Sequence, residues 1–339
     1  MKVREQPSLR ALNTFGVCAR ASLLIEVESE EDVVSLPQLD PQMDFVLGGG
    51  SNVLFVTDVP GTVFLNRIAG IEVIEENAHD ALIEAGAGEN WHGLVCWTLR
   101  RGLYGLENLS LIPGLAGAAP MQNIGAYGVE LAPMLESVTA WDWQTAGWVV
   151  LNNEQCGFGY RDSRFKSAQA GRYFITSIRL RLHKHFHAQL EYSGLQEELE
   201  STGVSHPAAA DVSAAVIRLR QRKLPDPAVQ GNAGSFFKNP VISLDRLESL
   251  RGRFPALPAW TLSATEAKIP AAWLIENCGL KGYQHQGAAV SERHALVLLN
   301  RNKASGLAIW QLAQHVQCQV RLRFGITLEP EPRIYPDDS

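Results

Sequence analysis

The most constraining feature of this sequence is a stretch of 22 residues without a charged side chain, residues 108–129. Its length alone would suffice for a helix that crosses a bilayer. It contains Pro113, Pro120, four glycines and three amide side chains, however, and irregular backbone of that kind cannot satisfy its polar groups in lipid. Long segments without regular structure are usually functional or disordered, and the apolar content here argues against disorder. The segment is therefore predicted to be a binding loop in a soluble protein.

Composition and charge narrow the function classes. The 339 residues suit two or three domains, and 46% hydrophobic with 19% charged residues is typical of a globular chain. A net charge of −6 argues against binding to nucleic acid or to acidic membranes. Residues 1–140 hold 7 basic and 18 acidic residues (net −11), whereas residues 141–339 hold 23 and 18 (net +5). This asymmetry indicates either a localised anionic ligand in the later part or chance segregation on solvated faces.

The cysteines and the N-terminus indicate a cytoplasmic protein. There are five cysteines with no C-x-x-C spacing, so a disulfide framework or a structural zinc site is not expected and a reducing compartment fits. The first 15 residues have no apolar core, so they do not resemble a signal peptide.

Hydrophobic periodicity predicts an α+β chain. Alternating or short apolar runs indicate strands, and apolar residues spaced at helical intervals indicate helices. Asn90 is a plausible N-cap and Gly102 a plausible C-cap of one helix. The strands are expected within residues 22–29, 45–56, 61–66, 71–88, 136–143, 147–152, 172–186, 287–290, 294–299 and 324–328, and the helices at 30–36, 90–101, 211–223, 271–278 and 305–323.

Two glycine patterns invite a dinucleotide-binding interpretation. Residues 48–52 (GGGSN) follow a strand but precede another strand, so no helix N-terminus is available to receive a pyrophosphate. Residues 86–88 do open a helix, but the third glycine position is occupied by Trp91. The GGGSN turn remains able to cradle a phosphate with its backbone N–H groups. A tight hairpin is the alternative.

Three segments carry candidate catalytic side chains. Arg161, within GYRDSRFK, has the guanidinium that suits a carboxylate or phosphate, although it could be an ordinary surface charge. Ser235 lies in a turn-rich segment without a G-x-S-x-G elbow, which leaves a proton-donating serine or a packed structural turn. Glu331 stands between two prolines and is better fixed than a solvated tail. His183, His185 and His187 would share one face of a strand, but a solvated face is favoured over a metal site.

Taken together and in this order, the motifs resemble those of the UDP-N-acetylenolpyruvoylglucosamine reductase (MurB) family. They span nearly the whole chain, and residues 191–194 (EYSG) resemble the extra substrate loop of one branch. The matching segments are NTFGV (13–17), GGGSN (48–52), residues 105–128, GYRDSRFK (159–166), GNAGSFFKNP (231–240), AAWLIENCGLKG (271–282) and LEPEPR (328–333).

The resemblance implies an α+β, FAD-binding fold of the PCMH/vanillyl-alcohol-oxidase type with two subdomains and an α+β substrate-binding domain. It places the FAD subdomains at residues 1–66 and 67–210, the substrate domain at 211–326, and a tail returning to the active site at 327–339. Metal is not implied. The implied FAD-binding residues are Gly48, Gly49, Gly50, Ser51, Asn52, Pro113, Gly114, Gln122, Asn123, Gly125, Ala126, Tyr127 and Arg333.

The implied reaction has two halves. NADPH reduces FAD and leaves; UDP-N-acetylenolpyruvoylglucosamine then enters the same cleft and receives a hydride from flavin N5 at its methylene carbon. Arg161 and Glu331 match the pair that polarises the substrate carboxylate, which requires Glu331 to be protonated through a raised pKa. Ser235 matches the proton donor to the α-carbon. Tyr192, Lys223 and Asn239 match positions that hold the UDP-sugar, and the family implies a monomer.

Two departures and two alternatives remain. Ala118 and Ala119 stand where some members carry hydroxyl groups near the flavin, and the chain ends soon after Arg333. Another FAD-dependent oxidoreductase of the same fold would also use GGGSN. A flavin- or nucleotide-sugar-binding protein without catalysis is the second alternative, but the retention of all three catalytic residue types argues against it.

Overall fold

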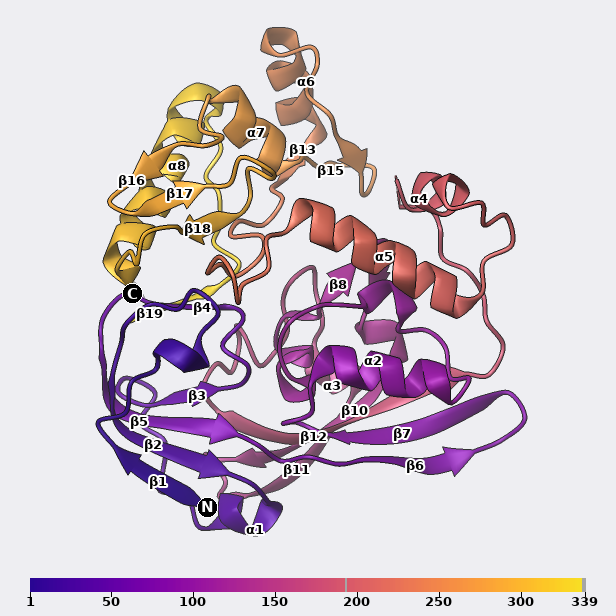
Figure 1. Ribbon diagram of the computed structural model, residues 1–339, viewed down its shortest axis with the longest axis vertical. Coiled ribbons are helices and arrows are strands. Elements are labelled where there is room, and N and C mark those ends of the chain that lie inside the picture. Colours follow the sequence, from indigo (N-terminus) through magenta and orange to yellow (C-terminus); the bar gives the residue numbers. More distant parts are fainter. Residues whose placement is uncertain (193, 337–339) are drawn as a thin grey trace. The chain divides into compact units, whose positions relative to one another are not determined.

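The fold is described from a computed structural model, in which residues 1–192 and 194–336 are placed (Figure 1). The chain forms two compact units, and it passes between them several times. The first unit comprises Met1–Pro7, Ala21–Gly50 and Val59–Gln221. The second comprises Ser8–Arg20, Ser51–Asp58 and the described chain from Arg222 onward. The mixture of helices and strands in both units confirms the predicted α+β class.

The first unit begins with a four-stranded sheet in the order β1-β2-β5-β3. Strands β2 and β3 each pair in parallel with β5, and β1 joins β2 antiparallel. The near-continuous apolar sequences of β2 and β5 fit strands covered on both faces. The Ser29 side chain accepts from the N–H of Asp32 and starts α1. The bounds are β1 Lys2–Glu5, β2 Ala21–Val27, β3 Phe45–Leu47, β5 Val59–Asn66 and α1 Glu30–Val34.

A second, fully antiparallel sheet of five strands has the order β11-β10-β12-β7-β6. Helix α2 packs against it through Trp91, Leu94 and Val95, which share a core with Ile83 and Ile178. As expected, Asn90 caps α2 with its side chain, and Gly102 follows the helix with a φ of +68°. The bounds are β6 Ile71–Glu76, β7 Asp80–Gly86, β10 Leu135–Asp142, β11 Gly147–Asn152, β12 Tyr173–His183, α2 Trp91–Arg100 and α3 Asn153–Cys156.

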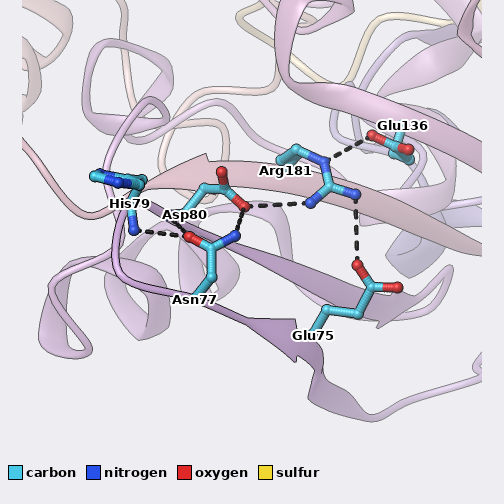
Figure 2. Close-up of polar contacts among 6 residues, drawn as sticks. All are labelled: Glu75, Asn77, His79, Asp80, Glu136 and Arg181. Carbon is cyan, nitrogen blue, oxygen red and sulfur yellow. Dashed lines mark hydrogen bonds and ion pairs between the residues drawn. The ribbon is translucent and has the colours of Figure 1, made fainter.

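The second sheet carries a polar network centred on Arg181 of β12 (Figure 2). The guanidinium lies 3.2 Å from Asp80 Oδ1, 3.0 Å from Glu136 Oε2 and 3.7 Å from Glu75 Oε2. The Asn77 side chain accepts from the backbone N–H of Asp80 and closes the hairpin between β6 and β7. Because these side chains are partly exposed, the ion pairs contribute little to the free energy of unfolding. They mark a solvated part of the sheet surface.

Helices and short turns complete the first unit. Helices α4 and α5 pack on each other through Leu195, Leu199, Val212 and Val216. The uncharged stretch of residues 108–129 forms no long helix; it is built from 3-10 turns and a small hairpin. The bounds are α4 Leu195–Ser201, α5 Ala209–Lys223, η2 Glu107–Leu109, η3 Ala116–Ala118, η4 Pro120–Gln122, η5 Ala132–Met134, β8 Gly125–Ala126 and β9 Val129–Glu130.

The described part of the second unit contains three α-helices, one 3-10 helix and three small sheets. The sheets have the orders β13-β15-β14, β16-β17-β18 and β19-β4, of which the last pair is parallel. The long helix α8 is capped by the side chain of Ser305, which accepts from the N–H of Ala308. The bounds are η1 Arg10–Leu12, β4 Val53–Phe55, β13 Val241–Ser243, α6 Leu244–Arg253, β14 Trp260–Thr261, β15 Glu266–Lys268, α7 Ala271–Asn277, β16 Gln284–His285, β17 Ala288–Val290, β18 Leu298–Asn300, α8 Gly306–Phe324 and β19 Arg333–Tyr335.

Some local predictions are wrong, among them the strand expected at residues 294–299, of which β18 covers only Leu298 and Leu299. The strand expected at residues 324–328 does not form, because α8 continues to Phe324 and Gly325 ends it with a φ of +66°; Ile326 and Leu328 are buried individually. The GGGSN turn is not a hairpin, since β3 pairs with β5 and β4 with β19. Among the helices of the described residues, none has both the length and the apolarity to cross a membrane.

The predicted division into two FAD-binding subdomains, a substrate domain and a tail, with boundaries at residues 66, 210 and 326, is defined by which ligand each part binds. The packing of the chain does not show ligand binding, so this division stays a prediction. Helix α5, expected to open the substrate domain, groups with the first unit up to Gln221. Residues 337–339 of the predicted tail lie outside the described residues.

Candidate active site

Two glycine turns of the first unit meet backbone to backbone. Gly49 follows β3, and a Cβ atom built on it would lie 2.9 Å from the Cα of Gly114. A Cβ atom on Gly48 would lie 3.4 Å from the Cβ of Ala118. Gly50 and Gly114 have φ values of +62° and +120°, which favour glycine. Gly48 and Gly49 of the GGGSN turn therefore lie against Ala118 and Gly114 of the uncharged stretch, and the assignment of these residues to FAD stays a prediction.

The start of the uncharged stretch is fixed to helices α2 and α5. The hydroxyl oxygens of Ser110 and Ser213 are 2.7 Å apart, and Arg220 Nε donates to the Leu111 carbonyl at 3.2 Å. The Leu111 N–H donates to His92 Nδ1 at 3.0 Å, although Leu111 has a φ of +56°. Burial, followed by the nearby Arg220 cation, lowers the pKa of His92. A neutral imidazole thus serves as the acceptor that holds this strained residue.

The end of the stretch forms a tight hairpin, β8–β9. Its two turn residues, Tyr127 and Gly128, both have positive φ (+50° and +84°), which matches the twist of a two-residue hairpin. The Tyr127 ring packs edge-on against Tyr192, with ring centroids 5.0 Å apart. Tyr192, a predicted substrate residue, is exposed, whereas Ser193 of the same segment lies outside the described residues. A predicted FAD residue and a predicted substrate residue are therefore in contact.

Asn123 directs its polar side-chain atoms toward the protein. Its amide nitrogen donates to Glu130 Oε2 at 2.8 Å and to the Gly159 carbonyl at 3.2 Å, and its Oδ1 accepts from the N–H of Ala132 at 3.0 Å. Asn123 is 2% exposed. The predicted contribution of Asn123 to FAD binding therefore has to come from its backbone, while Gln122 precedes it in η4.

Arg161 occupies a tight turn bracketed by Gly159 and Asp162, whose backbones exchange hydrogen bonds of 3.0 and 3.3 Å. Its φ of +55° is unusual for a residue with a side chain, and such strain is concentrated at functional positions. Arg161 Nη2 donates to the Gly125 carbonyl at 2.5 Å. The turn therefore aims the guanidinium at the β8–β9 hairpin.

In the second unit, a rigid platform presents the serine segment. The Asn13 side chain closes its own turn through bonds to Leu9 and Val17. A Cβ atom on Gly231 would lie 2.2 Å from the Phe15 carbonyl oxygen, so only glycine fits there. The Asn232 side chain accepts from the N–H of Gly234, directly before Ser235. The segments NTFGV and GNAGSFF thus form one packed structure.

Ser235 and Glu331 lie on adjacent backbone segments of the second unit. The Glu331 N–H donates to the carbonyl of Phe236 at 2.8 Å, and Phe237 bridges to Pro330. Both Ser235 and Glu331 are half-buried. The predicted proton donor and the predicted polarising carboxyl are therefore carried by paired backbone.

The same region includes the end of the GGGSN turn and Arg333. Asn52 Nδ2 donates to the Glu331 carbonyl at 3.2 Å, and the Arg333 N–H donates to the Asn52 carbonyl at 3.0 Å. The parallel pairing of β4 with β19 continues this contact. Ser51, Asn52 and Arg333, all predicted to bind FAD, thus belong to one substructure with Glu331.

The other two predicted substrate residues have separate surroundings. Lys223 is exposed, and its charge is among the influences on His294, whose pKa is lowered first by burial and then by Lys223. Asn239 Oδ1 accepts from the N–H of Ala271 at the start of α7. Lys223 and Asn239 are therefore placed near α7 and His294, and no described hydrogen bond joins them to Ser235.

Three residues near these segments were not predicted from the sequence: His92, Glu130 and Arg220. Each supports a loop whose shape is set by tertiary contacts, so no short motif marks it. Arg220 donates to the Leu111 carbonyl, and burial lowers the pKa of its guanidinium.

His183, His185 and His187 do not lie together on one strand, as the sequence had suggested. Strand β12 ends at His183, so His185 and His187 do not continue it. Within residues 1–192 and 194–336, no group of three or more His, Cys, Asp or Glu side chains is arranged to hold a metal ion.

Comparison with known proteins shows which family the chain belongs to. The family described as "FAD binding domain" matches residues 21–149, and the "UDP-N-acetylenolpyruvoylglucosamine reductase, C-terminal domain" family matches residues 226–335. The UDP-N-acetylenolpyruvoylglucosamine reductase of Chromobacterium violaceum is 46% identical over 98% of this chain and 99% of its own length. That of Pseudomonas aeruginosa is 44% identical over 99% of both chains. The crystal structure of the reductase (MurB) from Thermus caldophilus superposes with a TM-score of 0.68 at 26% identity, covering 99% of this chain and 100% of that one. The chain belongs to the UDP-N-acetylenolpyruvoylglucosamine reductase family.

Proposed function

We propose that this protein catalyses the FAD-dependent, NADPH-driven reduction of UDP-N-acetylenolpyruvoylglucosamine to UDP-N-acetylmuramate, a step of peptidoglycan synthesis. Family membership over nearly the full length supports this activity. The structural observation that carries it is the pairing of the Ser235 segment with the Glu331 segment, which keeps a hydroxyl and a carboxyl on one rigid frame.

The residues of the first unit fit FAD. A phosphate or a flat ring needs close approach to backbone N–H groups, and Gly50 and Gly114 give these two turns positive φ values that side chains disfavour. The match of residues 21–149 to an FAD-binding domain agrees with this assignment. We assign to FAD the residues Gly48, Gly49, Gly50, Ser51, Asn52, Pro113, Gly114, Gln122, the backbone of Asn123, Gly125, Ala126, Tyr127 and Arg333. When bound, FAD takes a hydride from NADPH and supplies one to the enolpyruvyl methylene carbon.

The chain's own residues handle the charge and the proton of the second half-reaction. Addition of a hydride to the methylene carbon places negative charge on the α-carbon and its carboxylate. We assign Arg161 to bind this carboxylate with its guanidinium and Glu331, in its protonated form, to donate a hydrogen bond to it. Ser235 then donates its hydroxyl proton to the α-carbon. The net addition of one hydride and one proton gives the saturated lactyl ether.

The substrate's UDP group is assigned to Tyr192, Lys223 and Asn239. Lys223 offers an exposed cation for the diphosphate, and Asn239 has amide hydrogens available because only its Oδ1 is engaged in the described structure. The net charge of +5 in residues 141–339 suits this anionic ligand. A cytoplasmic monomer is proposed, and the five free cysteines fit a reducing compartment.

The test follows the flavin spectrum through both half-reactions. The purified protein, loaded with FAD, is expected to bleach anaerobically with NADPH and to recover its colour when UDP-N-acetylenolpyruvoylglucosamine is added. Recovery with another acceptor but not with this substrate would contradict the proposal and favour a different oxidoreductase. A protein that takes up no FAD would favour a binding protein.

A further inference from the structure

We propose that Asn123 and Glu130 are positioning residues for Arg161: together they hold the turn that carries the arginine against the hairpin that receives its guanidinium. This inference rests on the proposed role of Arg161 in binding the substrate carboxylate. Neither Asn123 nor Glu130 is assigned to touch the substrate.

The Arg161 turn needs external support. Arg161 has a φ of +55°, a conformation that side chains disfavour. A residue in that conformation persists only where its surroundings determine it. The reciprocal backbone bonds between Gly159 and Asp162 close the turn, but they do not fix its orientation relative to the rest of the first unit.

Asn123 provides a fixed attachment for one end of the turn. Its amide nitrogen donates to the Gly159 carbonyl at 3.2 Å and to Glu130 Oε2 at 2.8 Å. The Ser163 hydroxyl donates to the Met121 carbonyl at 2.6 Å and secures the other end of the turn to the same loop. Because Asn123 is itself held by the N–H of Ala132 and is buried, its amide has little freedom to turn away. Gly159 is therefore tied to the hairpin through a single buried amide.

Glu130 connects this amide to the acceptor of the guanidinium. Glu130 ends β9, which pairs with β8, and the Gly125 carbonyl of β8 accepts from Arg161 Nη2 at 2.5 Å. A Cβ atom on Gly125 would lie 2.8 Å from Arg161 Nη1 and 3.0 Å from Glu130 Cγ. The guanidinium and the Glu130 stem thus pack on the same Cα atom. The contacts therefore form a closed ring. The Arg161 turn is bonded to Asn123, Asn123 to Glu130 of the hairpin, and the hairpin, through the Gly125 carbonyl, to the guanidinium of Arg161.

Asn123→Ala opens this ring but keeps the backbone of Asn123, which is the only part of that residue that we assign to FAD. We expect the variant to keep FAD and to be reduced by NADPH within about twofold of the unchanged protein. Its reoxidation by UDP-N-acetylenolpyruvoylglucosamine should slow by at least about tenfold, because the guanidinium then samples orientations that do not bind the carboxylate. Substrate binding to the oxidised protein, measured by calorimetry without NADPH, should weaken as well.

Asn153→Ala is the matched control. The Asn153 amide also donates to two backbone carbonyls of the first unit, those of Ala132 and Leu135, at 2.7 and 2.8 Å. It has no bond to Glu130 or to Gly159. A loss of stability without a change in reoxidation is expected for Asn153→Ala, and equal effects of the two variants would overturn the positioning role.

Two further comparisons keep the test decisive. In an Arg161→Lys background, adding Asn123→Ala should slow reoxidation by no more than about twofold, since Asn123 acts through Arg161; a full additional tenfold loss would overturn the proposal. Glu130→Gln keeps an acceptor for the amide and should reoxidise within about threefold of the unchanged protein, whereas Glu130→Ala should resemble Asn123→Ala. If Asn123→Ala does not fold, the two Glu130 variants decide. If the unchanged protein is not reoxidised by this substrate, the proposed function fails instead.

Discussion

The side-chain amide of Asn52 donates to the backbone carbonyl of Glu331 across 279 positions of sequence, at a distance of 3.2 Å. The bond fastens the tail segment of the second unit to the turn before β4, and Arg333 returns a backbone bond to Asn52. The bond fixes the backbone of Glu331, from which its carboxyl-bearing side chain extends. The GGGSN motif therefore has a structural role in the second unit in addition to its proposed contact with FAD.

Asn52→Ala should loosen the Glu331 segment. We expect a loss of about 1 kcal/mol in the free energy of unfolding, the usual value of one such hydrogen bond, measured by urea denaturation. Reoxidation of the flavin by substrate should also slow. Asn277→Ala is the control, because its amide donates to one backbone carbonyl of the same unit, that of Trp273. If both variants reoxidise alike, the Asn52 bond does not position Glu331.

Ser235→Ala should separate the two half-reactions. Removal of a general acid costs roughly 10²- to 10⁴-fold in the step that it serves, so reoxidation by substrate should slow within that range while reduction by NADPH is spared. Rapid mixing under anaerobic conditions measures both rates. Ser243→Ala, which removes the N-cap hydroxyl of α6, should cost about 1 kcal/mol of stability and leave reoxidation unchanged. Equal damage to both half-reactions in Ser235→Ala would contradict proton donation.

The regular elements were largely predictable because they depend on local patterns. The alternation around Asn77 produced the hairpin of β6 and β7, and the cap at Asn90 produced the start of α2. Residues 324–328 show the limit of such patterns: apolar residues that are buried one by one look like a strand until the pairing partner is known.

The residue types of the candidate site were predictable from motifs, but their engagement was not. Asn123 sits in a segment predicted to bind FAD, yet its amide is used on Glu130 and Gly159. Glu130 lies 7 positions and Gly159 lies 36 positions further along the chain. No local sequence pattern therefore identifies them as partners of Asn123. The left-handed backbone at Arg161, where glycine would be easier, is likewise visible only in three dimensions.

Acid should destabilise the protein through His92 and His294. Burial lowers the pKa of both imidazoles in the folded state. Below the ordinary value of about 6.5 the unfolded chain therefore binds more protons than the folded one, and the stabilisation present above that pH is lost as the pH falls toward the folded pKa values. Urea denaturation between pH 7.5 and 5 should show this fall, and His294→Gln should flatten it. An unchanged slope in His294→Gln would contradict the assignment.

The cysteines should differ sharply in reactivity. Burial raises the pKa of the Cys156 thiol to about 11, so almost none of it is thiolate at pH 8. Cys18 and Cys318 are exposed. Titration with a disulfide reagent at pH 8 should show a fast phase that Cys18→Ser and Cys318→Ser remove, while Cys156 reacts only after denaturation. Modification of Cys156 in the native protein during the fast phase would refute its burial.

Glu107 should act on stability in the opposite direction from the histidines. Glu107, next to the start of the uncharged stretch, is 3% exposed, and burial raises the pKa of its carboxyl despite a 2.8 Å bond from the N–H of Gly105. The folded state therefore binds more protons than the unfolded chain above pH 4.5, and this contribution is lost as the pH rises through the folded pKa.

Each pKa unit of that shift corresponds to about 1.4 kcal/mol. Glu107→Gln keeps an acceptor for Gly105 without the charge, so it should raise the free energy of unfolding at pH 8 and have little effect at pH 4.5. Glu248→Gln, on the exposed face of α6, is the control and should change neither value by more than about 0.5 kcal/mol. A Glu107→Gln variant that is equally destabilised at both pH values would show that the carboxylate, rather than its burial, is what the loop requires.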